Sequence, residues 1–135
     1  MDRPNFVYVL WRDSDGAHKI GQSINPWQRM RDQQRELGCQ MKIVALLERP
    51  LGDALNVEQS AHFALWRYRL DGEWFSAKLK AIFAAVEFAA SQEDIRQFQL
   101  RRLAAVDAIE AEWGRRPTRD EIRELQRQGR VPEHV

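Results

Sequence analysis

Two short apolar runs near the N-terminus, separated by a turn, place the strongest constraint on the fold. Residues 6–11 are rich in β-branched and aromatic side chains, residues 13–16 are Asp, Ser, Asp and Gly, and residues 17–21 form a second short run. Strands favour β-branched and aromatic residues, whereas Asp, Ser and Gly favour turns. The pattern therefore predicts a β-hairpin.

Helix and strand signals follow one another after this hairpin. Asn25 followed by Pro26 is typical of a helix start, and Gly38 is well placed to end that helix. The next apolar run, at residues 41–47, is followed by a proline and a glycine. A short, bounded apolar run indicates a buried strand. We therefore expect a third, central strand after the first helix.

The rest of the chain has a mainly helical pattern. Apolar side chains recur at helical spacing over residues 53–68, and the turn that follows leads into Trp74 and Phe75, which we assign to the hydrophobic core. Residues 77–113 contain no Gly or Pro and are rich in Ala, which favours helix. A capping box at residues 118–121 predicts one more short helix.

These signals predict an α/β (α+β) fold with a small, mainly antiparallel three-stranded sheet flanked by helices. The first domain is expected to cover residues 1–76. Residues 77–135 are expected to form a helical C-terminal extension that packs back on this domain or joins two copies of the chain as a homodimer. At 135 residues the chain is long enough to bury a core without disulfides.

Composition excludes several classes of protein. Cys39 is the single cysteine, so an internal disulfide cannot form and a structural zinc site is not expected. No apolar stretch approaches the length needed to span a bilayer, and we expect a cytoplasmic protein that does not bind membranes. The formal net charge is only +1, so contacts with nucleic-acid phosphates must come from locally placed side chains.

Four side chains in the first domain have the chemistry for phosphodiester hydrolysis. Tyr8 and Lys19 lie on neighbouring strands of the predicted hairpin, so their polar ends can converge on one face. Arg29 carries a planar fork of donors that suits a phosphate, and Glu58 offers hard oxygen ligands for Mg²⁺. Such a set can orient water, neutralise a phosphate and stabilise a leaving oxygen.

The order and spacing of these residues resemble the GIY-YIG nuclease superfamily, especially its phage-associated branch with KIG in place of YIG and a terminal EWF. The elements that carry the resemblance, within residues 5–76, are Phe6-Val7-Tyr8, Lys19-Ile20-Gly21, Arg29, Glu58 and Glu73-Trp74-Phe75. The resemblance implies an endonuclease that acts on DNA, or on RNA, with Mg²⁺ or Mn²⁺. It also implies that Tyr8 positions or deprotonates the attacking water and that Glu58 binds the metal ion.

Two positions depart from the strict superfamily pattern. Phe6 stands where the first motif has Gly, and Lys19 stands where the second motif has Tyr. A lysine can still orient water or stabilise negative charge. The superfamily's late asparagine has no clear counterpart after Phe75, so Glu58 is the one metal ligand that the sequence assigns.

Each of the four candidates also has a purely structural explanation. Tyr8 suits a half-buried strand position, Lys19 a solvated one, and Arg29 a charged helix face. Glu58 and His62 are four residues apart and suit an ordinary helix pair. The ordered set favours the functional interpretation. On position alone, four more residues are expected to contact a phosphate or the attacking water: His18, Gln22, Ser23 and Arg31.

Two other functions fit the same sequence. A module of this fold can bind nucleic acid without cutting it, and the missing asparagine favours that interpretation. Alternatively, the helical C-terminal region is the functional part and acts in protein interaction or dimerisation. A metal-dependent endonuclease is the leading hypothesis.

Overall fold

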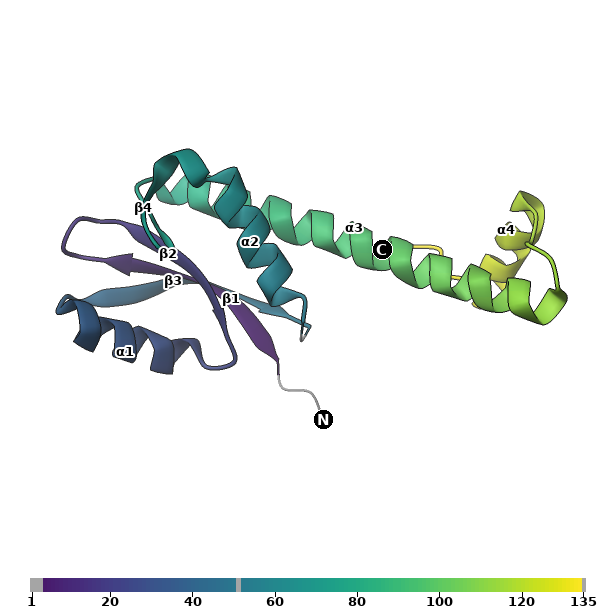
Figure 1. The fold of residues 1–135 in the computed structure, drawn as a ribbon, viewed down its shortest axis with the longest axis horizontal. Helices are drawn as coiled ribbons and strands as arrows, with labels where there is room; N and C mark the ends of the chain where they lie inside the picture. The colour runs from purple at the N-terminus through teal and green to yellow at the C-terminus, as the bar shows by residue number, and fades with distance from the viewer. Residues whose placement is uncertain (1–3, 51, 135) are drawn as a thin grey trace. The chain divides into compact units, whose positions relative to one another are not determined.

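The structure is a computed structural model that describes residues 4–50 and 52–134 (Figure 1). The chain divides into two compact units, residues 1–90 (unit 1) and residues 91–135 (unit 2). In chain order the elements are β1 (Asn5–Arg12), β2 (His18–Ser23), α1 (Pro26–Leu37), β3 (Met41–Arg49), α2 (Ala54–Ala64), the 3-10 helix η1 (Trp66–Tyr68), β4 (Arg69–Asp71), β5 (Trp74–Phe75), α3 (Leu79–Trp113) and α4 (Arg119–Arg127).

The strands form one antiparallel sheet in the order β3-β1-β2-β5-β4. The predicted hairpin is confirmed, because β1 and β2 pair from Phe6 opposite Ser23 to Trp11 opposite His18. The α+β class is also confirmed, but the prediction of three strands is wrong. β4 and β5 are three and two residues long. Strands this short show no alternating pattern, so the sequence indicated only a turn followed by core aromatics.

β3 lies at an edge of the sheet, which corrects the prediction of a central strand. Among the described strands it pairs only with β1. Only its two terminal residues, Met41 and Arg49, are buried. An apolar run indicates that a strand has hydrophobic faces, but it does not indicate whether a neighbouring strand pairs with each of its two edges. The location of β3 is therefore a property of the assembled sheet.

Helices cover both faces of the sheet in unit 1, and Figure 1 shows α1 and α2 on opposite sides of it. Val7 of β1 faces the core formed with α2 and with the first part of α3. Tyr8, one residue later, faces the other core, where α1 contributes Met30. The aromatic pair follows the same alternation, with Phe75 in the first core and Trp74 in the second. Both are buried, which confirms their core assignment.

In unit 1 the two ends of α1 agree with the prediction from the sequence, whereas the C-terminal end of α2 does not. The side chain of Asn25 accepts a hydrogen bond from the backbone N–H of Gln28 at 3.2 Å, and Gly38 ends α1 in the left-handed conformation with φ of 68°. Both features agree with the prediction. α2 ends at Ala64, before the predicted end at residue 68, and η1 completes the segment.

The division between the two units falls inside α3, fourteen residues after the expected domain end at residue 76 (90 − 76). Ile82, Val86, Ala89 and Ala90 of this helix belong to the core of unit 1. The helical pattern from residue 77 onward is continuous and contains no break. It therefore gave no signal that its first turns pack on the sheet.

Unit 2 has a small core of its own. The capping box is confirmed, because the Thr118 hydroxyl accepts from the Glu121 backbone N–H and the Glu121 carboxylate accepts from the Thr118 backbone N–H. Several arginines of unit 2 pair with carboxylates, for example Arg130 with Glu112 at 2.8 Å. The buried core residues are Val106, Ile109, Leu125 and Val131.

Within the described part of the chain, none of the helices combines the length and the apolar character needed to cross a membrane.

Residues 1–90 alone are expected to unfold in one cooperative transition, whereas residues 1–76 alone are not. The shorter fragment lacks Ile82 and Val86, whose burial stabilises the fold by about 3–6 kcal/mol together. Urea denaturation followed by circular dichroism compares the two fragments. Equal stability would show that the first turns of α3 contribute nothing to unit 1.

Candidate active site

Tyr8 packs its ring directly over Gly21 on the neighbouring strand. The two residues are cross-strand partners in the β1–β2 register. A Cβ atom built on Gly21 would lie 2.4 Å from the Tyr8 hydroxyl oxygen, so only glycine fits there. Tyr8 is 1% exposed, which makes it a fully buried residue rather than the half-buried strand aromatic considered above. The Lys19-Ile20-Gly21 motif therefore needs glycine at its third position, because the Tyr8 ring fills the space that a side chain there would occupy.

Arg29 of α1 reaches the hydroxyl group of Tyr8. Its exposed guanidinium forms a side-chain hydrogen bond with that hydroxyl. Burial raises the pKa of Tyr8 above its ordinary value, and Arg29 opposes this shift only in part. The carboxylates of Glu58 and Glu73 raise it further. Tyr8 is therefore a neutral phenol at neutral pH, able to donate or accept a hydrogen bond.

Lys19 lies in the interior and not in solvent. It is 5% exposed, and its Nζ atom is 3.4 Å from Oε2 of Glu73. Its cross-strand partners are Leu10 on β1 and Trp74 on β5. A buried ammonium needs a negative partner, because transfer from water into the protein is costly for an unpaired charge. Glu73 provides that partner.

Glu58 is a buried carboxyl group beside a second carboxyl group. It lies on α2, is 6% exposed, and forms a side-chain hydrogen bond with Glu73. Burial, followed by the charge of Glu73 and this hydrogen bond, raises the pKa of Glu58 to about 8, while Lys19 lowers it. At neutral pH the two carboxyls therefore share a proton. Loss of that proton would leave two negative charges next to each other.

His62 fixes the position of α2 next to Glu58. Its Nε2 atom is 2.7 Å from the carbonyl oxygen of Ile20, so Nε2 donates to β2. The same atom is 3.9 Å from Oε1 of Glu58, and the ring lies 5.2 Å from the ring of Phe75. His62 is thus a link between helix and strand, which orients the helix that carries Glu58.

The four principal candidates come together in the structure, along with one residue that the sequence did not single out. Tyr8 contacts Arg29, Lys19 contacts Glu73, and Glu73 contacts Glu58. Glu73 was noted only as the first letter of the terminal EWF motif. The one sequence signal for Glu73 was its place next to two core aromatics. These aromatics hold the backbone of Glu73 beside β2, and the Glu73 carbonyl oxygen accepts a hydrogen bond from the Ile20 N–H.

The four secondary candidates lie apart from these contacts. His18 is buried and, by strand alternation, lies on the opposite face from Lys19. Gln22 accepts a hydrogen bond from Asn5, and the Ser23 hydroxyl accepts from the backbone of Asn25. Arg31 is exposed and donates to Gln28. Their predicted contacts with nucleic acid remain predictions.

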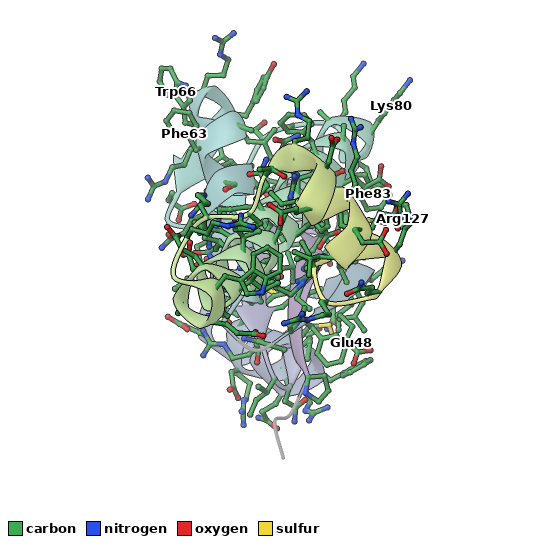
Figure 2. The ribbon with its side chains drawn as sticks, turned by 90° about the vertical axis from the view of Figure 1, so that its right-hand side faces the viewer. Glu48, Phe63, Trp66, Lys80, Phe83 and Arg127 are labelled. Atoms are coloured by element: carbon green, nitrogen blue, oxygen red, sulfur yellow. The ribbon has the colours of Figure 1, made fainter. Side chains whose placement is uncertain are left out.

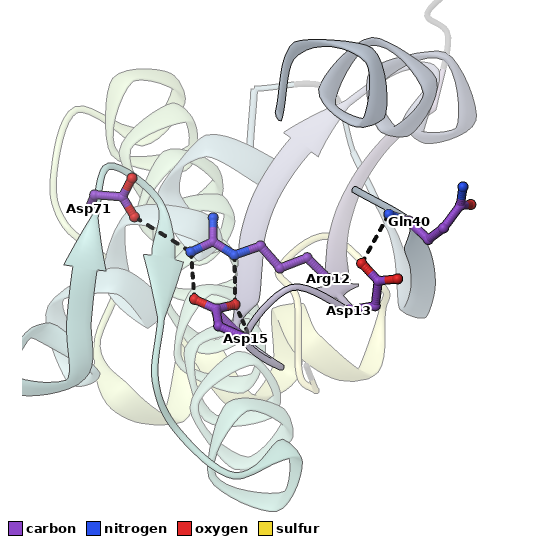
Figure 3. Close-up of polar contacts among 6 residues, drawn as sticks. Arg12, Asp13, Asp15, Gln40 and Asp71 are labelled. Atoms are coloured by element: carbon purple, nitrogen blue, oxygen red, sulfur yellow. Dashed lines mark hydrogen bonds and ion pairs between the residues drawn. The ribbon is translucent and has the colours of Figure 1, made fainter. Parts of the chain in front are cut away.

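A polar cluster around Arg12 holds the segment that carries Glu73 (Figure 3). Arg12 makes two 2.8 Å hydrogen bonds to Asp15 and lies 4.0 Å from Asp71 of β4. Its guanidinium also stacks over the ring of Trp74, with 4.3 Å between the carbon and the ring centre. The turn from β4 to β5, which includes Glu73, is therefore tied to the β1–β2 hairpin.

The donor set at Glu58 and Glu73 fits a small divalent cation. Magnesium is commonly held by one or two carboxylates, with water and substrate phosphates as its other ligands. Across residues 4–50 and 52–134, no three His, Cys, Asp or Glu side chains group together in a way that could hold a metal. An ion held by these two carboxylates would therefore take its remaining ligands from water and substrate.

Comparison with known proteins identifies one family. The family model described as the T5orf172 domain matches residues 5–90. These residues include all five side chains that meet at the candidate site, and the match ends at the boundary of unit 1. No curated protein matches the chain significantly. No solved structure does either.

Substituting Gly21 with Ala is expected to destabilise the protein by about 1–3 kcal/mol, because the new methyl group overlaps the Tyr8 ring. In a Tyr8→Ala background the same substitution should cost far less, since the ring is gone. Chemical denaturation of the four proteins measures this coupling. Additive effects of the two substitutions would contradict the proposed contact.

Without divalent metal, the free energy of unfolding is expected to fall as the pH rises from about 5 to about 8. The pKa of Glu58 is raised from 4.5 to about 8 by folding, so the folded state binds this proton more tightly and loses stability as the proton leaves. Glu58→Gln should remove most of this decline. Urea titrations in chelator at several pH values provide the measurement. Glu36→Gln, at an exposed carboxylate on α1, serves as the control, and an unchanged pH slope in Glu58→Gln would refute the assignment.

Proposed function

Because the chain belongs to the T5orf172 domain family, we propose that unit 1 is an endonuclease domain that hydrolyses DNA phosphodiester bonds with a divalent metal ion. T5orf172 domains are phage-associated and related to nuclease folds of the GIY-YIG and HNH kinds. The order of Tyr8, Lys19-Ile20-Gly21, Arg29 and Glu58 supports the GIY-YIG relationship. The observation that carries the proposal is a carboxyl pair, in which Glu58 is buried and Glu73 is partly exposed, close to Tyr8, Lys19 and Arg29.

Arg29 and Lys19 supply the positive charge that a phosphodiester requires. Arg29 is exposed, so its donors can reach a nonbridging phosphate oxygen while it keeps its hydrogen bond to Tyr8. Lys19 is buried beside Glu73 and acts at short range, on charge that develops near the carboxyl pair. The two cations therefore have different roles, binding for Arg29 and charge stabilisation for Lys19.

Tyr8 orients the attacking water in this proposal. Its raised pKa keeps the proton on the hydroxyl at neutral pH, so positioning through a hydrogen bond is favoured over proton removal by a phenolate. The hydroxyl is held in place by the ring packing over Gly21 and by Arg29. A fixed hydroxyl lowers the cost of bringing water into line with the phosphorus atom.

Glu58 and Glu73 would hold Mg²⁺ or Mn²⁺, which neutralises charge on the phosphate and the leaving oxygen when bound. The shared proton must leave before both carboxylates can act as ligands. The ammonium group of Lys19 must also leave Glu73 and turn toward the substrate. Metal affinity is therefore expected to rise with pH.

Purified protein is expected to nick or cut plasmid DNA in the presence of Mg²⁺ or Mn²⁺. Glu58→Gln and Glu73→Gln should each lower the rate by about 100-fold or more, since each removes a carboxylate from the site. Glu36→Gln, at an exposed carboxylate on α1, is the matched control and should cut normally. Agarose electrophoresis of a supercoiled plasmid measures the rate of cutting by the wild type and the three variants. Equal cutting by the wild type and both site variants would reject the proposal.

A second candidate function is DNA binding without cleavage, and the Lys19–Glu73 contact favours it. An ammonium 3.4 Å from a carboxylate competes with a metal ion for the same oxygen. In this case Lys19 neutralises the carboxyl pair permanently, and Arg29 binds phosphate. Salt-sensitive DNA binding that survives chelation, with no cleavage in Mg²⁺ or Mn²⁺ on several substrates, would support this alternative.

A further inference from the structure

Two large aromatic side chains project into solvent at the end of α2. Phe63 is 79% exposed and Trp66, which begins η1, is 64% exposed. Figure 2 shows both projecting outward from this end of the helix. Leu65 between them is buried and holds this turn to the core. Residues three apart at a helical end lie on the same side, so the two rings form one exposed aromatic surface.

Positive charge follows these aromatics along the chain. Trp66, Arg67, Tyr68 and Arg69 alternate an aromatic ring with a guanidinium, and all four are exposed. Between Glu58 and Asp71 the sequence contains no acidic residue. Neither arginine forms an ion pair with a carboxylate among the residues that the structure describes. Arg69 instead donates to the carbonyl oxygen of Gly72 at 2.6 Å.

This surface lies on the same segment that supplies the carboxyl pair. Glu58 is on α2 and Glu73 follows β4, so the aromatics lie between them in the chain. A helix rises about 1.5 Å per residue, so Phe63 is roughly 8 Å along the axis from Glu58. Glu58 is buried and Phe63 is exposed, so the two side chains leave α2 on different sides. A strand of nucleic acid whose phosphate occupied the candidate site would have to pass around the helix to bring its bases to this surface.

We propose that Phe63 and Trp66, with Arg67 and Arg69 beside them, form a stacking surface for unpaired bases of the nucleic-acid strand that enters the candidate active site. Aromatic rings bind the faces of bases, and nearby arginines bind the phosphates between them. A protein partner would instead be expected to meet a broad apolar core with charges confined to its rim. Here rings and guanidiniums alternate along one short segment. The inference rests on the proposed function for the location of the phosphate.

Binding to fluorescein-labelled single-stranded 15-mers in chelator tests the proposal without requiring cleavage. Trp66→Ala and Phe63→Ala should each weaken single-strand binding by about 5- to 100-fold, while binding to the matching blunt duplex changes less than about twofold. Arg67→Ala should make single-strand affinity less sensitive to salt. Fluorescence anisotropy at three salt concentrations gives both quantities.

Phe88→Ala is the matched control, because Phe88 on α3 is also 64% exposed but follows an acidic residue, Glu87. It should leave DNA binding unchanged. Glu58→Gln separates the two proposals, since it should lower the cleavage rate by about 100-fold or more and keep single-strand binding. Loss of binding confined to the Phe63 and Trp66 variants would support the stacking surface even if no protein cuts DNA.

Three results would overturn the stacking proposal. The first is single-strand affinity that is unchanged in both aromatic variants, including the case in which the wild type binds no single strand. The second is an equal loss of duplex binding, which would indicate a general phosphate surface. The third is a change of self-association, measured by sedimentation, in place of a change in DNA affinity, because the surface would then be an interface between copies of the chain.

Discussion

The register of β1 against β2 is the constraint on which the candidate site depends. It places Tyr8 opposite Gly21, and the absence of a side chain at Gly21 lets the tyrosine ring lie flat across the strand. A slip of one residue would turn Tyr8 to the other face and exchange the two cores. The same register places Lys19 between Leu10 and Trp74, so both strand residues of the site follow from one set of backbone hydrogen bonds.

Buried charge is the second organising feature of unit 1. Two carboxyls, Glu58 and Glu73, meet close to the buried ammonium of Lys19. Such an arrangement is costly unless a proton or a cation balances it. The fold retains it because His62, the hydrophobic face of α2 and the Arg12 cluster hold the surrounding backbone. A site whose charge is incompletely balanced can respond to pH and to bound cations.

Individual residues show why sequence reasoning reached some features and not others. Asn25, Gly38 and Thr118 act through neighbours within four residues, so their roles as caps were predictable. Glu73 acts through Glu58, fifteen residues away (73 − 58), and this contact needs both the helix and the short strand β5 in place. β4 and β5 were missed for a related reason, since strands of two or three residues are defined by their partners and not by their own pattern.

The sequence by itself determined the α+β class, the hairpin, the helix caps and the order of four chemically suitable residues, because local propensity and spacing encode all of these. Only the tertiary structure decided that β3 lies at an edge, that the first turns of α3 complete the core of unit 1, and that a second carboxyl lies beside Glu58. It also decided that Phe63 and Trp66 are left exposed. These features depend on which surfaces meet when distant segments pack, and no local pattern records that.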